Sequence, residues 1–280
     1  MRLPRLFAAA IAAMLALPLC AQSIRHISLP EAQAIDPATL SDAELLDLLE
    51  RLEQGRAPMM RRVSMFGIPT GFGAPRGLWF VSAATTNRRD RRTLGDWDAS
   101  FAVGFGLGDP VNGIGVTPII DITSVSGFHF AESGKVGVKL SREVAFGPNW
   151  RGAVGLDLDN LLTWGDSRVL DVETTLSVSA VRGGGRGWRY PVMLSAGYGT
   201  GVKTGTNDPG WFAGAGVGLS DSYGLSLGWY GDEAIGGVNI WTGRNKNLQI
   251  SLGVGDITNN VDGRRLLVGA SFARPFRNAH

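Results

Sequence analysis

In the stretch DWDASFAVGFGLGD, residues 96–109, large apolar side chains alternate with small or polar ones. Trp97 and Phe101 fall on one face, and Asp98 and Gly104 fall on the other. Successive side chains of a β-strand point to opposite sides. The period of two therefore predicts a strand with one oily face and one small or polar face.

The same alternation recurs along most of the chain. Further segments lie at residues 114–123, 135–140, 151–159, 170–179, 190–199, 211–219, 223–229, 237–240, 248–255 and 266–273. With a weaker first segment at 78–86 they make about twelve strands, and single-chain bacterial barrels have an even number.

Composition agrees with an all-β protein. The chain has 40 glycines among 280 residues, about twice the usual share of roughly 7%. Each interior glycine costs a helix about 0.5–1 kcal/mol relative to alanine. Hydrophobic residues make up 44% of the chain and charged residues 19%, which is unlike a disordered chain.

Two architectures produce alternation, a soluble sandwich and a membrane barrel. A sandwich exposes long charged side chains on its outer face, whereas here the second face is mostly small. The segments are also near the 9–11 residues of a membrane-crossing strand. Aromatic residues lie near segment ends, as interfacial girdles require: Trp97, Trp150, Tyr190, Trp211, Tyr223, Trp229, Phe272 and Phe276. These features predict a closed antiparallel transmembrane β-barrel with its oily face towards lipid.

Residues 77–276 therefore resemble bacterial outer-membrane β-barrel proteins, of the small porin-like kind. The final strand, Leu266 to Phe276, looks like the C-terminal recognition strand of that class, although four residues, 277–280, follow it. The resemblance implies an outer-membrane location and contact with lipid and lipopolysaccharide.

The N-terminal part differs from the barrel. Residues 1–21 have the charged, apolar and cleavage regions of a signal peptide; Cys20 only loosely resembles a lipoprotein site. Residues 22–76 are expected in the periplasm, with a short helix near 41–54 that begins with a capping box at Ser41 and Glu44. The leucine face of this helix is a candidate to plug the barrel, pack on its rim or bind a periplasmic protein: Leu45, Leu48, Leu49 and Leu52. The segment around Gly71, Gly73 and Pro75 is interpreted as a flexible lead-in.

Charge and cysteine content exclude several functions. Removing Arg2 and Arg5 with the signal leaves 27 − 2 = 25 basic residues against 25 acidic ones, so a nucleic-acid partner is not expected. The only cysteine is Cys20, so the mature chain has no thiolate for a metal site or a nucleophile. No cofactor and no metal are expected.

Charged side chains on the expected inner face gather in the first half of the barrel. The lumen-lining candidates are Asp98, Asp121, Lys135, Lys139, Arg151, Asp157, Asp159, Asp171 and Glu173. They could brace the wall as cross-strand pairs, or form a selectivity surface for a small polar solute.

The loops carry two weaker candidates. An arginine cluster in the first outward loop suits lipopolysaccharide phosphates, or is simply solvated: Arg88, Arg89, Arg91 and Arg92. His129 and Ser133 in the second outward loop are a minimal pattern for a lipid hydrolase. The sequence thus favours a narrow porin-like channel, with a closed barrel that anchors a periplasmic partner as the alternative and a hydrolase as a minor one.

Overall fold

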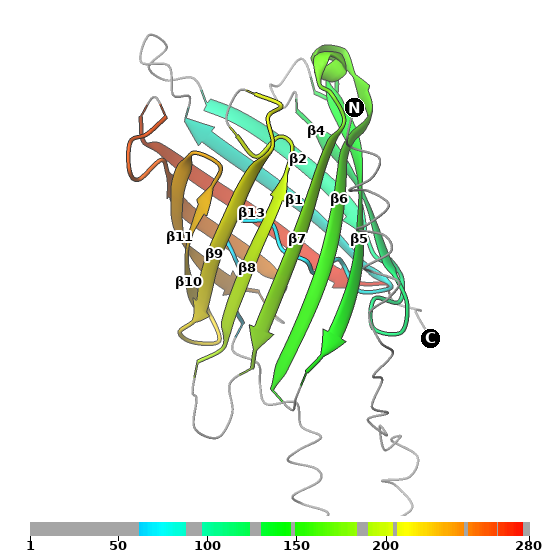
Figure 1. Cartoon of the computed structure of the whole chain (residues 1–280), viewed down its shortest axis with the longest axis vertical. Coiled ribbons are helices and arrows are strands. Elements are labelled where there is room, and N and C mark those ends of the chain that lie inside the picture. The colour runs from blue at the N-terminus through cyan, green and yellow to red at the C-terminus, as the bar shows by residue number, and fades with distance from the viewer. Residues whose placement is uncertain are drawn as a thin grey trace, which may run out of the picture.

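A computed structural model describes residues 62–87, 97–123, 130–146, 149–183, 190–203, 206–243, 246–261 and 263–276. These residues form a single antiparallel sheet that closes on itself (Figure 1). Its strands are β1 (Leu78–Asn87), β2 (Trp97–Phe105), β3 (Leu107–Gly108), β4 (Gly115–Ile122), β5 (Gly134–Ala145), β6 (Trp150–Trp164), β7 (Glu173–Arg182), β8 (Val192–Gly199), β9 (Gly210–Gly218), β10 (Tyr223–Tyr230), β11 (Glu233–Thr242), β12 (Leu248–Gly255) and β13 (Arg265–Pro275).

The barrel has 12 strands, as the alternation predicts. Each strand from β4 to β13 pairs with the next, β13 pairs with β1, and β1 pairs with β2. The short β3 continues β2 after Gly106, and both pair with β4, which closes the sheet. A closed sheet leaves no unpaired edge, which is a condition for crossing lipid with strands.

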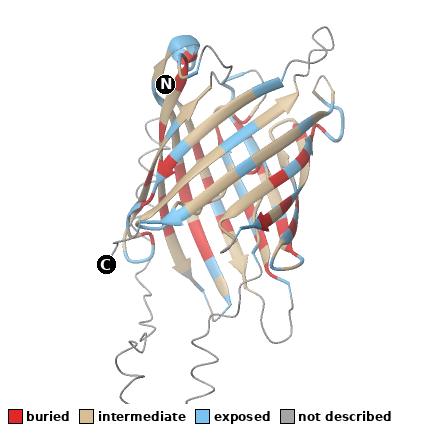
Figure 2. Ribbon diagram, turned by 180° about the vertical axis from the view of Figure 1, so that it is seen from behind, coloured by how far each residue is buried: buried red, intermediate tan, exposed pale blue. Residues whose placement is uncertain are grey.

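The predicted direction of the two faces is confirmed. Exposed and buried residues alternate along the strands (Figure 2). Large apolar side chains on the outer face remain exposed, for example Trp97 at 52% and Leu227 at 63%. The inner glycines and serines between them are mostly buried. A soluble protein rarely exposes so much contiguous apolar surface, so this face is the one that meets lipid.

The only helical element among the described residues is the 3-10 turn η2 (Gly165–Val169). No helix in this part of the chain has the length and apolar character needed to span a bilayer. The predicted signal peptide and the helix at 41–54 lie outside the described residues.

The predicted boundary between the strands at 151–159 and 170–179 is wrong. The pairing of β5 with β6 shifts between Val136 and Val138, opposite Asn160, whose φ is +59°. This bulge inserts extra residues into β6, which runs on to Trp164, and β7 begins only at Glu173. Asp171 therefore lies in the loop between them and not on the inner face of a strand. Its carboxylate accepts a hydrogen bond from the side chain of Asn207 in the next loop on the same side of the barrel.

The expectation of a flexible lead-in is also wrong for residues 62–76, here called the inner segment. This segment lies inside the barrel and contacts the inner faces of successive strands. It enters beside the end of β9, where a β-carbon at Gly218 would overlap the Arg62 carbonyl, and the Arg62 guanidinium donates to the Lys246 carbonyl. It leaves beside Gly106, directly before β1.

Candidate functional site: the barrel lumen

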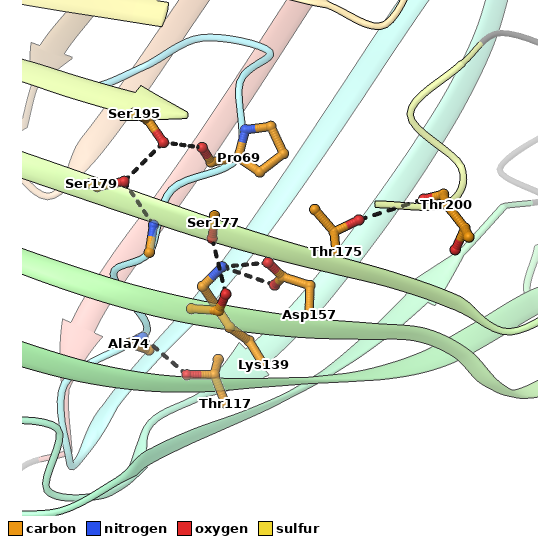
Figure 3. Close-up of polar contacts among 12 residues, drawn as sticks. Pro69, Ala74, Thr117, Lys139, Asp157, Thr175, Ser177, Ser179, Ser195 and Thr200 are labelled. Atoms are coloured by element: carbon orange, nitrogen blue, oxygen red, sulfur yellow. Dashed lines mark hydrogen bonds and ion pairs between the residues drawn. The ribbon is translucent and has the colours of Figure 1, made fainter. Parts of the chain in front are cut away.

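Hydroxyl side chains of the barrel wall hold the backbone of the inner segment (Figure 3). The Gly71 amide donates to Ser179 Oγ (2.8 Å), and the Ala74 amide donates to Thr117 Oγ1 (3.0 Å). In the opposite sense, Ser195 Oγ donates to the Pro69 carbonyl (2.6 Å). Each such bond contributes roughly 0.5–1.5 kcal/mol. Because the partners are main-chain groups, these contacts position the segment without requiring particular side chains from it.

Glycine on both sides allows a close approach. The backbone of Gly71 lies against β6, where a β-carbon on Gly71 would overlap the Ala153 carbonyl. A β-carbon on Gly155, in the same strand, would lie 2.9 Å from the Gly71 Cα atom. No larger residue fits at either position without moving the backbone. Some of the glycines that mark the inner face in the sequence therefore form the seat of this segment.

A small apolar core fixes the segment against the other half of the barrel. Ile68 of the segment, Phe212 of β9 and Val202 of the loop before β9 are buried together at 5%, 1% and 1% exposure. Met65 and Tyr230 pack against them, and the Phe212 and Tyr230 rings lie 5.8 Å apart. The lumen on this side is thus filled by protein.

The inner face of the barrel consequently has two parts. We call the inner faces of β4–β12 the covered wall, since its hydroxyl residues are almost fully buried: Thr117 at 2%, Ser177 at 0%, Ser179 at 3% and Ser195 at 4%. We call the inner faces of β13, β1 and β2 the open wall. The inward residues along its middle are exposed or half-exposed: Ser82, Ala84, Ser100, Ala102, Gly269 and Ser271. Further along β2, Gly104 is buried against the Phe80 ring.

The middle of the open wall is lined by small residues, between Phe80 of β1 and Leu267 of β13, which also face inward. Ala84 is paired with Gly269 on one side and Ser100 on the other, and is itself exposed. At Gly269 an added β-carbon would meet no atom closer than 3.8 Å. Ala84 lies three residues inside the end of β1, so its exposure indicates that space remains along this wall.

Charged residues gather on the covered wall in β4–β7. Lys139 Nζ lies 2.9 and 2.7 Å from the two carboxylate oxygens of Asp157, its partner across the strands. Lys135 is the cross-strand neighbour of Asp121. Asp159 lies beside Gly137, and the Glu173 carboxylate lies against Gly201. Of the predicted lining residues, these six are brought together on one wall.

The remaining predicted lining residues lie outside this group. Asp98 is on the inner face of β2, in register with Ser100, and is exposed near the Asn87 end of β1. Arg151 lies at the start of β6, with its guanidinium 3.7 Å from the Glu143 carboxylate. Asp171 is in a loop, as described above. The lipopolysaccharide candidates Arg88, Arg89, Arg91 and Arg92 and the helix leucines Leu45, Leu48, Leu49 and Leu52 lie outside the described residues.

Ser133, the candidate nucleophile, is buried and makes hydrogen bonds that stabilise the fold. It is 5% exposed. Its hydroxyl lies 3.0 Å from those of Thr123 and Ser167, and it accepts the Ser167 amide at 3.1 Å. A nucleophile needs an accessible oxygen next to a base, whereas these contacts hold η2 against the ends of β4 and β5. His129 lies outside the described residues.

The sequence interpretation missed the inner segment and a second ion pair. The Arg265 guanidinium contacts the Glu233 carboxylate, which is 2% exposed, on the inner side of β11 and β13. Both residues lie at the ends of alternating segments. Extending the alternation to them would have placed both side chains on the inner face. The only sequence signal for the inner segment was indirect: the wall that it covers is rich in small residues.

The closed 12-stranded barrel, its apolar outer face and its polar interior define the class: this is a transmembrane β-barrel protein. No protein-family model matches the sequence, and no curated protein matches it.

Solved structures with a similar fold include the KdgM porin, which is 13% identical with a TM-score of 0.46 over 69% of this chain and 98% of that chain. The COG4313 outer membrane channel from Pseudomonas putida F1 is 13% identical, with a TM-score of 0.43 over 75% of this chain and 100% of that one. Outer membrane phospholipase A from Escherichia coli is 12% identical, with a TM-score of 0.41 over 72% of this chain and 93% of that one. At these identities the likeness is one of fold alone.

Proposed function

We propose that the protein is a narrow porin-like channel for small polar solutes, with its passage displaced to one side of the lumen. The observation that carries this proposal is the contrast between the two walls. Ser177 on the covered wall is fully buried, whereas Ala84 on the open wall is exposed although it faces inward. The passage follows β13, β1 and β2.

The size of the barrel supports a restricted passage. Barrels of about eight strands are filled by their own side chains, and those of about 16–18 strands hold an aqueous channel. A barrel of 12 strands lies between these limits, and the inner segment takes up part of the added space. The chemistry of the remaining lining, which is small on one side and charged on the other, suits polar solutes.

The test is the conductance of the purified full-length protein in planar bilayers. Discrete single-channel steps, with permeation of small sugars into proteoliposomes, are the expected result. A folded protein that gives no steps and no sugar uptake would contradict the channel. Substituting Ala84→Leu should reduce both signals, while Ala83→Leu on the lipid-facing side of the same strand serves as the matched control.

A second candidate is a closed barrel that anchors a periplasmic partner through Leu45, Leu48, Leu49 and Leu52. The packing of Ile68 with Phe212 and Val202 favours it, because this core fixes the chain that follows the predicted helix. Pull-down with and without residues 22–61 tests this function and leaves the inner segment in place. Conductance that persists in the shortened protein supports the channel instead.

A further inference from the structure

We propose that Phe66 of the inner segment sets the size limit of the passage. This inference rests on the proposed channel function, and it assigns the role of constriction to one aromatic ring.

The Phe66 ring occupies a recess made of paired glycines. Gly237 of β11 and Gly253 of β12 are direct cross-strand partners. A β-carbon at Gly237 would lie 2.6 Å from the ring, and one at Gly253 would overlap it. The ring therefore rests directly on the backbone of the two strands, and larger residues at either position would displace it.

The backbone on both sides of the ring is also fixed. The Phe66 amide donates to Ser226 Oγ at 3.0 Å. Two residues earlier, Gln249 Nε2 donates to Ser64 Oγ at 3.3 Å and also to Asn239 Oδ1 at 3.1 Å. Asn239 is fully buried and accepts a further bond from Ser251 Oγ at 2.7 Å. This network limits movement of the segment at the position of the ring.

The ring lies where the covered wall meets the open wall. A β-carbon at Gly269 of β13 would be 4.0 Å from the edge of the Phe66 ring, and Gly269 is the partner of Ala84. Phe66 is half-buried, whereas Ile68, two residues further on, is 5% exposed in the apolar core. Phe66 is therefore the large side chain of the inner segment that borders the passage, opposite Gly269 and its partner Ala84.

A held ring opposite small residues acts as a steric filter. Its faces limit width, and it adds no charge to the passage, so its removal should change the size of admitted solutes more than the preference for cations or anions. A ring that only fills the lumen core would change stability without changing the size limit. The two roles are separated by measuring permeation against solute size.

The experiment compares Phe66→Ala and Phe66→Leu with Phe272→Ala in the full-length protein. Phe272 contacts Trp79 in a tilted arrangement, ring centroids 5.6 Å apart, on the lipid-facing side. Its truncation therefore removes an equal ring from outside the lumen. Proteoliposome swelling with mono-, di-, tri- and tetrasaccharides measures the size limit. Folding is checked by the shift in gel mobility on heating.

Phe66→Ala is expected to raise conductance and to admit sugars at least one size larger, with Phe66→Leu intermediate and Phe272→Ala unchanged. Gly269→Val, whose β-carbon would meet no atom closer than 3.8 Å, should lower conductance with Phe66 in place. If the parent protein conducts but folded Phe66→Ala or Phe66→Leu keeps its size limit, the role of Phe66 is overturned and the channel stands. If Phe66→Ala does not fold, the size limit of Phe66→Leu and the conductance of Gly269→Val test the role of Phe66. A silent parent protein contradicts the channel itself.

Discussion

Lys139 and Asp157 form a two-point ion pair inside the barrel: Lys139 Nζ lies 2.9 and 2.7 Å from the two carboxylate oxygens. Their side chains are only 11% and 19% exposed. A buried pair of this kind costs much of its attraction in desolvation, but removing one partner leaves an uncompensated charge. The pair braces β5 against β6. Bracing is one of the two roles that the sequence leaves open for the charged residues on the inner faces of β4–β7, here called the charged wall.

Replacing Lys139 with methionine should therefore destabilise the barrel. The expected loss in the free energy of unfolding is about 3–5 kcal/mol, because Asp157 stays buried without its partner. Denaturant titration in lipid vesicles measures it. The double variant Lys139→Met with Asp157→Leu should recover most of the loss, and a single variant as stable as the parent protein would show that the pair does not brace the wall.

The charged wall should also make the channel prefer cations. Its four acids, Asp121, Asp157, Asp159 and Glu173, face two bases, Lys135 and Lys139, so with all of them ionised the sum is 2 − 4 = −2. Charged rings of this sign favour cations. The reversal potential in a salt gradient should show cation preference, and neutralising Asp121, Asp159 and Glu173 together should weaken it. Asp171→Asn, in a loop, is the control, and an anion preference in the parent protein would disprove the prediction.

The hydroxyl contacts of the inner segment can be tested one at a time. Ser179 Oγ accepts the Gly71 amide and donates to Ser195 Oγ, both at 2.8 Å, in a buried position. Ser179→Ala leaves the amide unsatisfied, which should cost about 1–3 kcal/mol. Ser271→Ala, on the half-exposed open wall, should change stability by less than about 0.5 kcal/mol. Equal effects of the two changes in denaturant titration would argue that the covered wall does not bind the inner segment.

The turn after β3 should give a local dependence on pH. Asp109 accepts hydrogen bonds from the Asn112 side chain (2.7 Å) and from the amides of Val111 (2.9 Å) and Asn112 (3.1 Å), which lower its pKa below the ordinary 3.8. A lowered carboxyl pKa stabilises the fold above the unfolded value, and this contribution is lost as the pH falls through the folded value.

Asp109→Asn should therefore destabilise this turn at neutral pH and have little effect below both pKa values. Amide hydrogen exchange of residues 109–113, measured at both pH values, checks this. Asp208→Asn, in a loop at the other end of the barrel, is the comparison. An effect of Asp109→Asn that persists unchanged in acid would contradict the ionised carboxylate as its cause.

Alternation predicted the barrel because a period of two is enforced wherever one face meets lipid and the other does not. Stretches such as residues 96–109 carry this pattern almost without interruption. It failed near Asp171 because the bulge at Asn160, opposite the residue between Val136 and Val138, changes the register. A bulge leaves little trace in the hydrophobic pattern. Boundaries near loops are for this reason less predictable than the strands themselves.

The inner segment could not be predicted from its own residues. It has no helical or alternating period, and its hydrogen bonds use backbone atoms, as at Gly71 and Ala74. The matching information lies on other strands, in the glycines and serines of the covered wall. Those residues show that the inner face is small, but not whether a solute or a part of the chain lies against it. For Ser179 a part of the chain does, and for Ala84 the space is open.

The most direct test of the open wall uses two adjacent residues of β1. Ala83 and Ala84 are both exposed, but Ala83 faces lipid and Ala84 faces the lumen. The only natural cysteine, Cys20, lies in the predicted signal peptide, so a single introduced thiol can be followed without interference. In planar bilayers, a charged, water-soluble thiol reagent should reduce the current through Ala84→Cys and leave Ala83→Cys unaffected. Unchanged current through a folded Ala84→Cys channel whose thiol does not react would contradict a passage along β13, β1 and β2.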